Sequence, residues 1–399
     1  MYFQALDDKE NCVGIYYGGR LLFDESLFPH NLEDHITWKY SGSITSDVEY
    51  VWFYVNGKNL NESCPDELLD ELKSKQAKMK AFRKAFEIAK INFREHCFYD
   101  LVPHDFLESF LETKNKITKH VFENYEKPET YEHLVAVEKL LYKIRYQELN
   151  ISNENARNLF VNSSSRTAAQ KILKSSKFID YNIYGTKTGR LATYRASFPI
   201  LTMKKELRTL IKPKNDWFVS LDYNGAEVRT VLNLLGIDQP DYDVHEWNME
   251  YVLNKHGISD RETAKTTFFG WLYNPSSSLI KGSIYDREKI MKEYYDGQHI
   301  KTPFGRKIEV DKDKALNYII QSTTADLVND RAVDIDKFLE DKKSFVSHIV
   351  HDEVVVDVSE DEKYLIPEIK DIFSNNKLDT FKTNLQAGKD YYNLGDLNL

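Results

Sequence analysis

Two short apolar segments that end in acidic residues constrain the fold of this 399-residue chain most strongly. The first, WFVSL at 217–221, runs directly into Asp222, and the second, at 345–356, is an apolar hairpin interrupted by Asp352 at its turn. A carboxylate placed straight after a buried strand destabilises the fold unless a cation or ordered donors meet it. The pattern therefore predicts a sheet in which the two strand ends, and with them the two carboxylates, converge.

Two carboxylates that converge repel each other, and the pKa of one of them rises unless divalent metal neutralises the pair. Oxygen ligands of this kind suit Mg²⁺, which keeps some of its waters and also binds phosphate oxygens. Two such ions about 4 Å apart can activate an attacking oxygen and stabilise a leaving one. The alternative for each residue alone is structural: Asp222 begins an Asx-type turn, and Asp352 caps the hairpin.

A second feature is a stripe of four residues at intervals of four, namely Arg261, Lys265, Phe269 and Tyr273. In an α-helix each such step drifts by only about 40°, so the four side chains share one face. The two cations can meet a triphosphate, and the two rings can stack on a base or a sugar. The structural alternative is an amphipathic helix with the rings in the core and the cations in solvent. Pro275 predicts that the helix ends soon after its last ring.

The pattern of the chain changes twice along its length. Aromatic and β-branched runs predict mixed β structure in residues 10–60, amphipathic stretches predict helices between about 65 and 160, and short strands alternate with helices after about 180. The expected strands of the first part are 12–17, 20–23, 35–40 and 49–55. The expected helices are 66–93, 105–125 and 130–149.

Composition excludes several classes of protein. With 41% hydrophobic and 29% charged residues the chain suits a globular protein, and it has no apolar run long enough to cross a bilayer. The three scattered cysteines, Cys12, Cys64 and Cys97, do not form a disulfide framework. The N-terminus has neither a secretory signal nor a transit peptide. We therefore expect a cytoplasmic protein, in the host cytoplasm if the source is viral, and no membrane partner.

The net charge of −9 argues against a general nucleic-acid coat protein. It does not exclude a DNA enzyme, because affinity depends on where the cations lie. Lys204, Lys205, Arg208, Lys212 and Lys214 form a local basic patch. Without further evidence this patch is interpreted as a solvated helix face.

The segments from about residue 180 to the C-terminus together resemble the family A DNA polymerases, the DNA polymerase I group. Residues 222–229 (DYNGAEVR) resemble the first palm motif of that family, and the stripe at 261–273 resembles its fingers-helix motif. His351-Asp352-Glu353, in its apolar hairpin, resembles the second palm motif. A tripeptide alone is weak evidence, whereas three motifs in the family's order and spacing are specific.

Shorter segments agree with this resemblance. The segments 188–190 (TGR) and 243–245 (DVH) resemble elements before the first palm strand and before the fingers helix. Asn317 and Gln321 resemble the helix that touches the primer–template minor groove, and the tail at 385–399 resembles the closing segment.

Two positions depart from the family pattern. Gly225 stands where the family usually has glutamine, and we expect altered contacts near the nascent base pair. Asn274-Pro275 replaces the glycine after the fingers tyrosine, and we expect a shortened or bent fingers element. Neither change removes a metal ligand or a phosphate-binding cation.

The resemblance implies an α+β right-hand polymerase with an antiparallel-sheet palm, helical fingers and a helical thumb, plus a small N-terminal α/β domain. The implied domains are the N-terminal domain at 1–100, the thumb at 101–178, the palm at 179–235 and 295–399, and the fingers at 236–294. The implied activity is template-directed extension of a primer 3′ end with dNTPs, with release of pyrophosphate. The partners are then primer–template DNA and dNTPs, and the cofactors are two Mg²⁺ ions, for which Mn²⁺ can substitute.

The resemblance also implies roles for individual residues. The metal ligands are Asp222, Asp352 and the backbone carbonyl of Tyr223, with Glu353 as an auxiliary catalytic carboxylate. The dNTP-binding residues are Arg261, Lys265, His245, Phe269, Tyr273 and Glu227. The DNA-binding residues are Arg190, Asn317, Gln321, His351 and Arg229. Lys265 is also placed to protonate the departing pyrophosphate, with a purely electrostatic role as the alternative. Glu227 fills the space that a ribose 2′-hydroxyl needs, which favours deoxynucleotides.

Many members of the family carry a proofreading exonuclease, whose site begins with Asp-x-Glu on a strand. Asp47-Val48-Glu49 is the only suggestive triplet here, and it precedes an apolar strand instead of following one. We therefore expect residues 1–100 to lack nuclease activity and to dock a separate exonuclease or a processivity factor. Small size without an exonuclease is typical of phage-like or organelle-type replication enzymes.

Two other functions stay open. A single-subunit RNA polymerase or a reverse transcriptase uses related motifs, although the RNA polymerases typically have a small residue at the position of Glu227. A non-catalytic DNA-binding accessory protein, built on a decayed polymerase, is the other alternative. The complete set of Asp222, Asp352, Arg261 and Lys265 argues against such decay.

Overall fold

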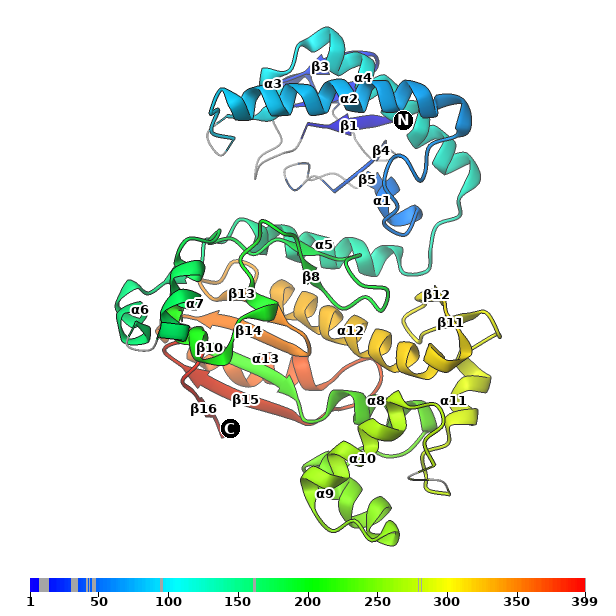
Figure 1. The fold of residues 1–399 in the computed structure, drawn as a ribbon, viewed down its shortest axis with the longest axis vertical. Helices are drawn as coiled ribbons and strands as arrows, with labels where there is room; N and C mark the ends of the chain where they lie inside the picture. The colour runs from blue at the N-terminus through cyan, green and yellow to red at the C-terminus, as the bar shows by residue number, and fades with distance from the viewer. Residues whose placement is uncertain are drawn as a thin grey trace. The chain divides into compact units, whose positions relative to one another are not determined.

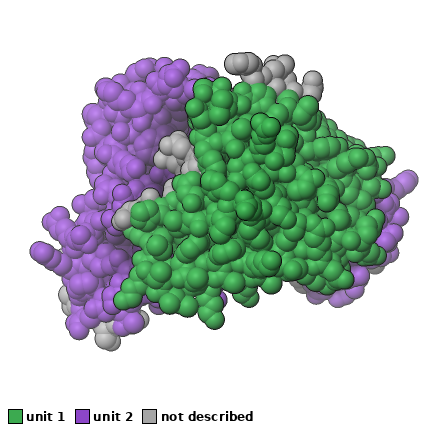
Figure 2. All heavy atoms as spheres, turned by 90° about the horizontal axis from the view of Figure 1, so that it is seen from above, with its two compact units in different colours: residues 1–139 green, residues 140–399 purple. Residues whose placement is uncertain are grey.

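The computed structural model describes residues 1–6, 14–29, 35–40, 42, 44, 48–93, 96–160, 163–278, 280 and 282–398. The chain divides into two compact units, residues 1–139 and residues 140–399, which are green and purple in Figure 2. The division lies inside helix α5 (Tyr131–Arg145), and so within the segment 101–178 that the sequence assigns to a thumb. The assignment of four domains stays a prediction.

The first unit combines short strands with long helices. The strands β1 (Phe3–Ala5), β2 (Ile15–Tyr17) and β3 (Arg20–Leu22) form an antiparallel meander, and β4 (His35–Thr37) pairs in parallel with β5 (Val48–Tyr50). A parallel bridge between Tyr2 and Ile36 links the two groups of strands. The helices are α1 (Val51–Tyr54), α2 (Asp66–Ile88), α3 (Phe98–Leu101), α4 (His104–Asn124) and the start of α5. The three long helices predicted from the sequence are therefore confirmed, while Cys12 and Val13 of the first predicted strand lie outside the described residues.

One predicted strand of the first unit is wrong over most of its length. Residues 51–54, expected to continue a strand at 49–55, form the single helical turn α1, and all four side chains are buried. A short run that is apolar on every side does not reveal its period, so packing decides between helix and strand. Here the run packs against α4 and Tyr131, with the Phe53 and Tyr131 rings 6.0 Å apart edge to face.

The second unit is built on a five-stranded antiparallel sheet in the order β13-β14-β10-β15-β16 (Figure 1). Its strands are β10 (Trp217–Tyr223), β13 (Phe345–Val350), β14 (Glu353–Val358), β15 (Thr383–Gly388) and β16 (Leu394–Asp396). The predicted strand at 217–221 and the predicted hairpin are both confirmed. In the register of the sheet Asp222 lies opposite Glu353 on one side and Asn384 on the other. The helices α12 (Lys312–Phe338) and α13 (Ile366–Ser374) pack on the sheet and on each other.

A helical layer follows β10 along the chain. It contains α8 (Ala226–Leu235), α9 (Val244–Trp247), a π-helix at Asn248–Leu253, α10 (Arg261–Tyr273) and α11 (Arg287–Tyr294). Its apolar side chains share one core with α12. Helix α10 begins where Asp260 accepts a hydrogen bond from the Thr263 backbone N–H (2.7 Å), and it ends two residues before Pro275, as predicted.

The remaining short elements of the second unit connect these layers. They include β6 (Asn150–Ile151), α6 (Asn153–Leu159), α7 (Ser163–Leu173), β7 (Tyr181–Asn182), β8 (Ala192–Thr193), a 3₁₀ turn at Lys205–Leu210, β9 (Ile211–Lys212), β11 (His299–Lys301) and β12 (Lys307–Glu309). Among the described helices, none combines the length and the hydropathy that a membrane crossing requires.

Candidate active site

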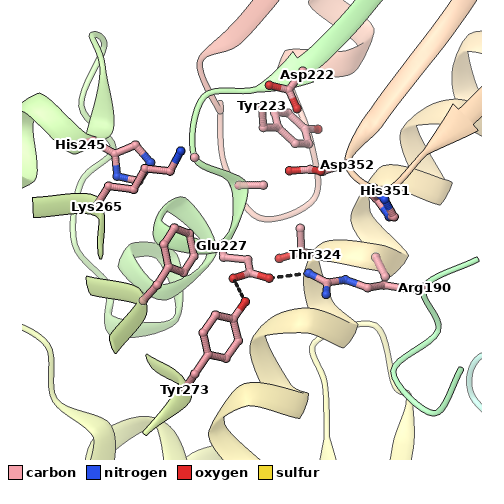
Figure 3. Close-up of a pocket in the computed structure, with 14 residues that line it drawn as sticks. Arg190, Asp222, Tyr223, Glu227, His245, Lys265, Tyr273, Thr324, His351 and Asp352 are labelled. Carbon is pink, nitrogen blue, oxygen red and sulfur yellow. Dashed lines mark hydrogen bonds and ion pairs between the residues drawn. The ribbon is translucent and has the colours of Figure 1, made fainter. Parts of the chain in front are cut away.

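A cavity of about 330 Å³ opens where the sheet of the second unit meets α10 and α12 (Figure 3). It brings together ten of the residues that the sequence assigns to the site: Arg190, Asp222, Tyr223, Glu227, His245, Lys265, Phe269, Tyr273, His351 and Asp352. Four further residues line the cavity, Gly225, Ala226, Thr324 and Ala325, and of these only Gly225 was singled out from the sequence, as a departure from the family pattern. They are small, so they shape the cavity without carrying chemistry that a sequence pattern could reveal.

The two acidic strand ends line the same side of this cavity. Burial, followed by the negative charge of Asp352, raises the pKa of Asp222 to about 7. The Asn384 amide, which donates a hydrogen bond to Asp222 (3.3 Å), and the charge of Lys265 oppose this rise. The carboxylates therefore converge as the strand pattern predicts. Their role as metal ligands stays a prediction.

The donors around Asp222 and Asp352 suit a divalent cation of the Mg²⁺ type. The Tyr223 side chain is buried and its hydroxyl donates to the Phe373 carbonyl (2.6 Å), so Tyr223 offers the cavity its backbone. Within the residues that the structure describes, no three His, Cys, Asp or Glu side chains are grouped to enclose a metal. Such an open set, with two carboxylates and one carbonyl, fits an ion that keeps waters and shares substrate oxygens. It does not fit a closed structural zinc site.

Helix α10 turns three of its four stripe residues into the cavity. Lys265 reaches toward the side lined by the carboxylates (Figure 3), and the Phe269 and Tyr273 rings stack 5.8 Å apart. Arg261 does not line the cavity. Its guanidinium donates to Asp243 (2.8 and 3.2 Å) and forms an ion pair with Glu262 (2.6 Å).

Asp243 organises the residues on the rim of the cavity. Besides Arg261, its carboxylate accepts hydrogen bonds from the Asn224 amide (2.8 Å) and from the backbone N–H groups of His245 and Glu246 (3.0 and 2.9 Å). These donors hold the pKa of Asp243 well below its usual range, although burial opposes them. The carboxylate thus caps α9 and fixes the backbone of His245. The sequence marked Asp243 only as part of a short motif.

His245 is a neutral side chain in this site. Burial lowers the pKa of its imidazole to about 4, so the ring is uncharged at neutral pH. Its Nδ1 is buried and has no hydrogen-bond partner among the described residues. An oriented neutral imidazole can accept or donate one hydrogen bond to a ligand in the cavity.

Glu227 forms the floor of the cavity between two other lining residues. Its carboxylate pairs with the Arg190 guanidinium and accepts a hydrogen bond from the Tyr273 hydroxyl (2.7 Å; Figure 3). Burial and this contact raise the pKa of Tyr273 to about 12, and an interaction with Gln321 on α12 opposes the rise. The three side chains tie the 188–190 segment, α8 and α10 together at one point.

Two glycines explain close backbone approaches at the site. Gly225 has φ +69°, and a Cβ at this position would lie 2.4 Å from Val244. The departure from the family's glutamine therefore accompanies a left-handed backbone packed against the segment before His245. Gly189 has φ +78°, and a Cβ at this position would lie 2.6 Å from the Arg306 guanidinium. That guanidinium forms a buried ion pair with Asp326 (2.6 Å).

Several predicted site residues lie elsewhere. Arg229 is fully buried, and its guanidinium donates to the backbone carbonyls of Asn224 (2.7 Å), Pro240 (2.8 Å) and Tyr242 (2.9 Å). This placement argues against the predicted DNA contact, because the side chain already braces the loop between α8 and α9.

Glu353, Asn317 and Gln321 do not line the cavity either. Glu353 is held by Ser220 and Tyr391, as described below. Asn317 and Gln321 lie on α12, on the helix that also contributes Thr324 and Ala325 to the cavity. The contact of Asn317 and Gln321 with DNA stays a prediction.

The fold described above is similar to that of a DNA polymerase domain. A solved structure to which it is similar is the POL domain of Pol1 from M. smegmatis, in complex with a DNA primer-template and dNTP. The TM-score is 0.60, the sequence identity is 12%, and the similarity covers 98% of this chain and 95% of that chain. The expected mixed α+β polymerase architecture is thus confirmed. The sequence matches no family model and no curated protein.

Proposed function

We propose that this chain is a template-directed DNA polymerase that extends a primer 3′ end with dNTPs and releases pyrophosphate. One observation carries the proposal: Asp222 and Asp352 share a single cavity with Lys265 on the opposite helix. Phosphoryl transfer requires this juxtaposition, because negative charge develops on oxygens that need both divalent cations and a positive side chain nearby.

Each residue then has a defined task. Asp222, Asp352 and the carbonyl of Tyr223 would hold two Mg²⁺ ions, which when bound polarise the phosphoryl group and favour ionisation of the primer hydroxyl. Lys265 and His245 bind the triphosphate, and Lys265 also offsets the charge of the departing pyrophosphate or protonates it. Phe269 packs on the sugar of the incoming nucleotide. Tyr273 lies beside the templating base.

Arg261 and the DNA-facing residues complete this assignment. Arg261 joins the phosphate contacts after it leaves Asp243. Arg190 and Gln321 are donors of the kind that test base-pair shape in the minor groove, where every correct pair offers similar acceptors. Asn317 and His351 are also assigned to contacts with the primer–template DNA.

The direct test is primer extension by the purified chain, with a recessed primer, four dNTPs and Mg²⁺. We expect template-dependent products that require both the primer 3′-hydroxyl and the divalent ion. Binding of DNA without any extension under these conditions would instead favour an accessory protein.

Substitution of Glu227 by alanine is expected to relax the preference for deoxynucleotides. The carboxylate occupies the cavity floor between Arg190 and Tyr273, where a 2′-hydroxyl would clash or lie unpaired. The ratio of kcat/KM for dNTP over rNTP should fall by roughly tenfold to a hundredfold. Glu227→Gln, which keeps the volume of the side chain, is the matched control and should retain most of the preference. Equal use of dNTPs and rNTPs by the wild-type chain would favour the RNA polymerase alternative.

We also propose that residues 1–100 lack nuclease activity. On β1 the buried Gln4 amide donates to Asn115 (2.8 Å) and Thr118 (3.1 Å) of α4, so this strand–helix contact is made by neutral groups. The residue before Asn115 on α4, Lys114, has a pKa lowered to about 7 by burial. Asp47 lies outside the described residues, and Glu49 accepts a hydrogen bond from Tyr54 (3.0 Å). Nuclease chemistry would need carboxylates around divalent metal.

A mismatched 3′ end labelled at its terminal nucleotide should therefore remain intact with the purified chain, Mg²⁺ and no dNTPs. The proposal would be overturned if the wild-type chain released the label and an Asp47→Ala variant did not. Proofreading by a separate exonuclease, or help from a processivity factor bound to the first unit, is then the expected arrangement.

A further inference from the structure

The carboxylate of Glu353 does not line the cavity, although Glu353 lies opposite Asp222 in the sheet, and both of its oxygens are engaged. Oε1 accepts a hydrogen bond from the Ser220 hydroxyl, and Oε2 accepts one from the Tyr391 hydroxyl (2.7 Å). The Arg208 guanidinium lies 3.9 Å from Oε2. Two hydroxyl donors and a nearby cation therefore hold this carboxylate in one position.

These contacts join the two strand ends that carry the catalytic carboxylates. Ser220 precedes Asp222 by two residues on β10, and Glu353 directly follows Asp352 at the start of β14. The bond between Ser220 and Glu353 therefore adds a side-chain link between the two strand ends, beside the backbone pairing of Asp222 with Glu353. Movement of Glu353 would move the turn that presents Asp352.

Tyr391 is itself rigidly held. It is almost fully buried, its backbone N–H donates to the Ile211 carbonyl (3.0 Å), and its ring meets His348 edge to face at 4.7 Å. The Arg208 guanidinium lies 4.5 Å from the ring centroid, on its face. Burial raises the pKa of Tyr391 above its ordinary value, so the hydroxyl keeps its proton and remains a donor to Glu353.

We propose that Tyr391 and Arg208 are positioning residues that fix Glu353, and through it the separation of Asp222 and Asp352. This inference rests on the proposed function, since it concerns the same pair of carboxylates. It also gives Arg208 a role other than that of a solvated cation in the basic patch. Substitution of a group that hydrogen-bonds to the residues around a metal and orients them typically lowers metal affinity or activity by about 10- to 100-fold.

The central variant is Tyr391→Phe, which removes a single oxygen, with Tyr392→Phe as the matched control. Tyr392 is the next residue and is 42% exposed. We expect Tyr391→Phe to weaken Mn²⁺ binding, followed by electron paramagnetic resonance in the absence of nucleotide, by about tenfold. Extension kcat should fall by about the same factor, while DNA affinity and KM for dNTP change less than about twofold. Tyr392→Phe should resemble the wild type in every measurement.

Arg208→Gln tests the second positioning residue against Lys205→Gln, its exposed neighbour in the basic patch. We expect the first substitution to weaken Mn²⁺ binding in the same way as Tyr391→Phe, and the second to have no such effect. If Arg208→Gln and Lys205→Gln have the same effect on Mn²⁺ binding, Arg208 belongs to the solvated patch and its part of the proposal is overturned.

A double-mutant cycle decides whether Tyr391 acts through Glu353. In a Glu353→Ala background, Tyr391→Phe should have almost no additional effect on Mn²⁺ binding, because the group that it positions is gone. A full additional effect in that background, or equal behaviour of Tyr391→Phe and Tyr392→Phe, would overturn the proposal. If the wild type extends no primer, the proposed function fails, whereas the Mn²⁺ measurements still test the positioning network.

Discussion

Asp222→Asn and Asp352→Asn are each expected to reduce primer extension by at least about 1,000-fold while DNA affinity stays within about twofold of the wild type. Asparagine keeps the shape of the side chain but removes the charge that two divalent cations need. DNA affinity depends mainly on contacts with phosphates elsewhere on the protein, so it should not follow the loss of activity. Single-turnover extension at saturating dNTP and Mg²⁺ measures the first quantity, and fluorescence anisotropy of a labelled primer–template measures the second.

The matched control for this prediction is Asp396→Asn. Asp396 is an exposed carboxylate on β16 of the same sheet and accepts a hydrogen bond from the Gln386 amide (2.8 Å). It lines no part of the cavity, so its substitution should leave extension unchanged. Normal extension by either Asp222→Asn or Asp352→Asn would show that the proposed metal site is wrong.

The parts of the fold that were predictable from the sequence have an unambiguous period. Strand β10 and helix α10 were located to within a few residues, because a short β-branched and aromatic run that ends in a carboxylate favours a strand, and a stripe at intervals of four favours a helix. The prediction of a strand at residues 51–54 was wrong. Their side chains are apolar on every side, and tertiary packing chose the helix.

Within the site, the sequence identified which residues gather but not which partners compete for them. Lys265 faces the cavity as its place in the stripe predicts, whereas Arg261, one turn earlier, is engaged by Asp243 from a different helix. Arg229 belongs to a segment that resembles the first palm motif and was assigned to DNA contact, yet its hydrogen bonds go to the backbone carbonyls of Asn224, before α8, and of Pro240 and Tyr242, after it. Such pairings depend on distances between segments that are remote in sequence, and periodicity carries no information about them.

The second large effect concerns stability, and it follows from the raised pKa of Asp222. In the folded protein this pKa is about 7, compared with 3.8 for an unperturbed aspartate. Between pH 4 and pH 7 the unfolded chain therefore loses a proton at Asp222 that the folded chain keeps. The folded state binds more protons in this window, so the free energy of unfolding decreases as the pH rises through it.

Asp222→Asn should remove this pH-dependent loss of stability. Below pH 4 the carboxyl is neutral in both states, and the variant and the wild type should unfold at similar denaturant concentrations. Above pH 7, without divalent metal, the variant should be more stable by a few kcal/mol, because each unit of pKa difference corresponds to about 1.4 kcal/mol. Chemical denaturation in EDTA at pH 4, 6 and 8 measures the difference, and Asp396→Asn should show no such trend.

Added Mg²⁺ should narrow the gap at pH 8 by stabilising the wild type alone, since a ligand that binds only the folded state raises its unfolding free energy. If one variant gained stability and lost extension, the buried, mutually repelling carboxylates would destabilise the folded state while being required for primer extension. A difference between wild type and Asp222→Asn that is constant from pH 4 to pH 8 would instead place Asp222 in a solvated environment. The electrostatic basis for a shared metal site with Asp352 would then be lost.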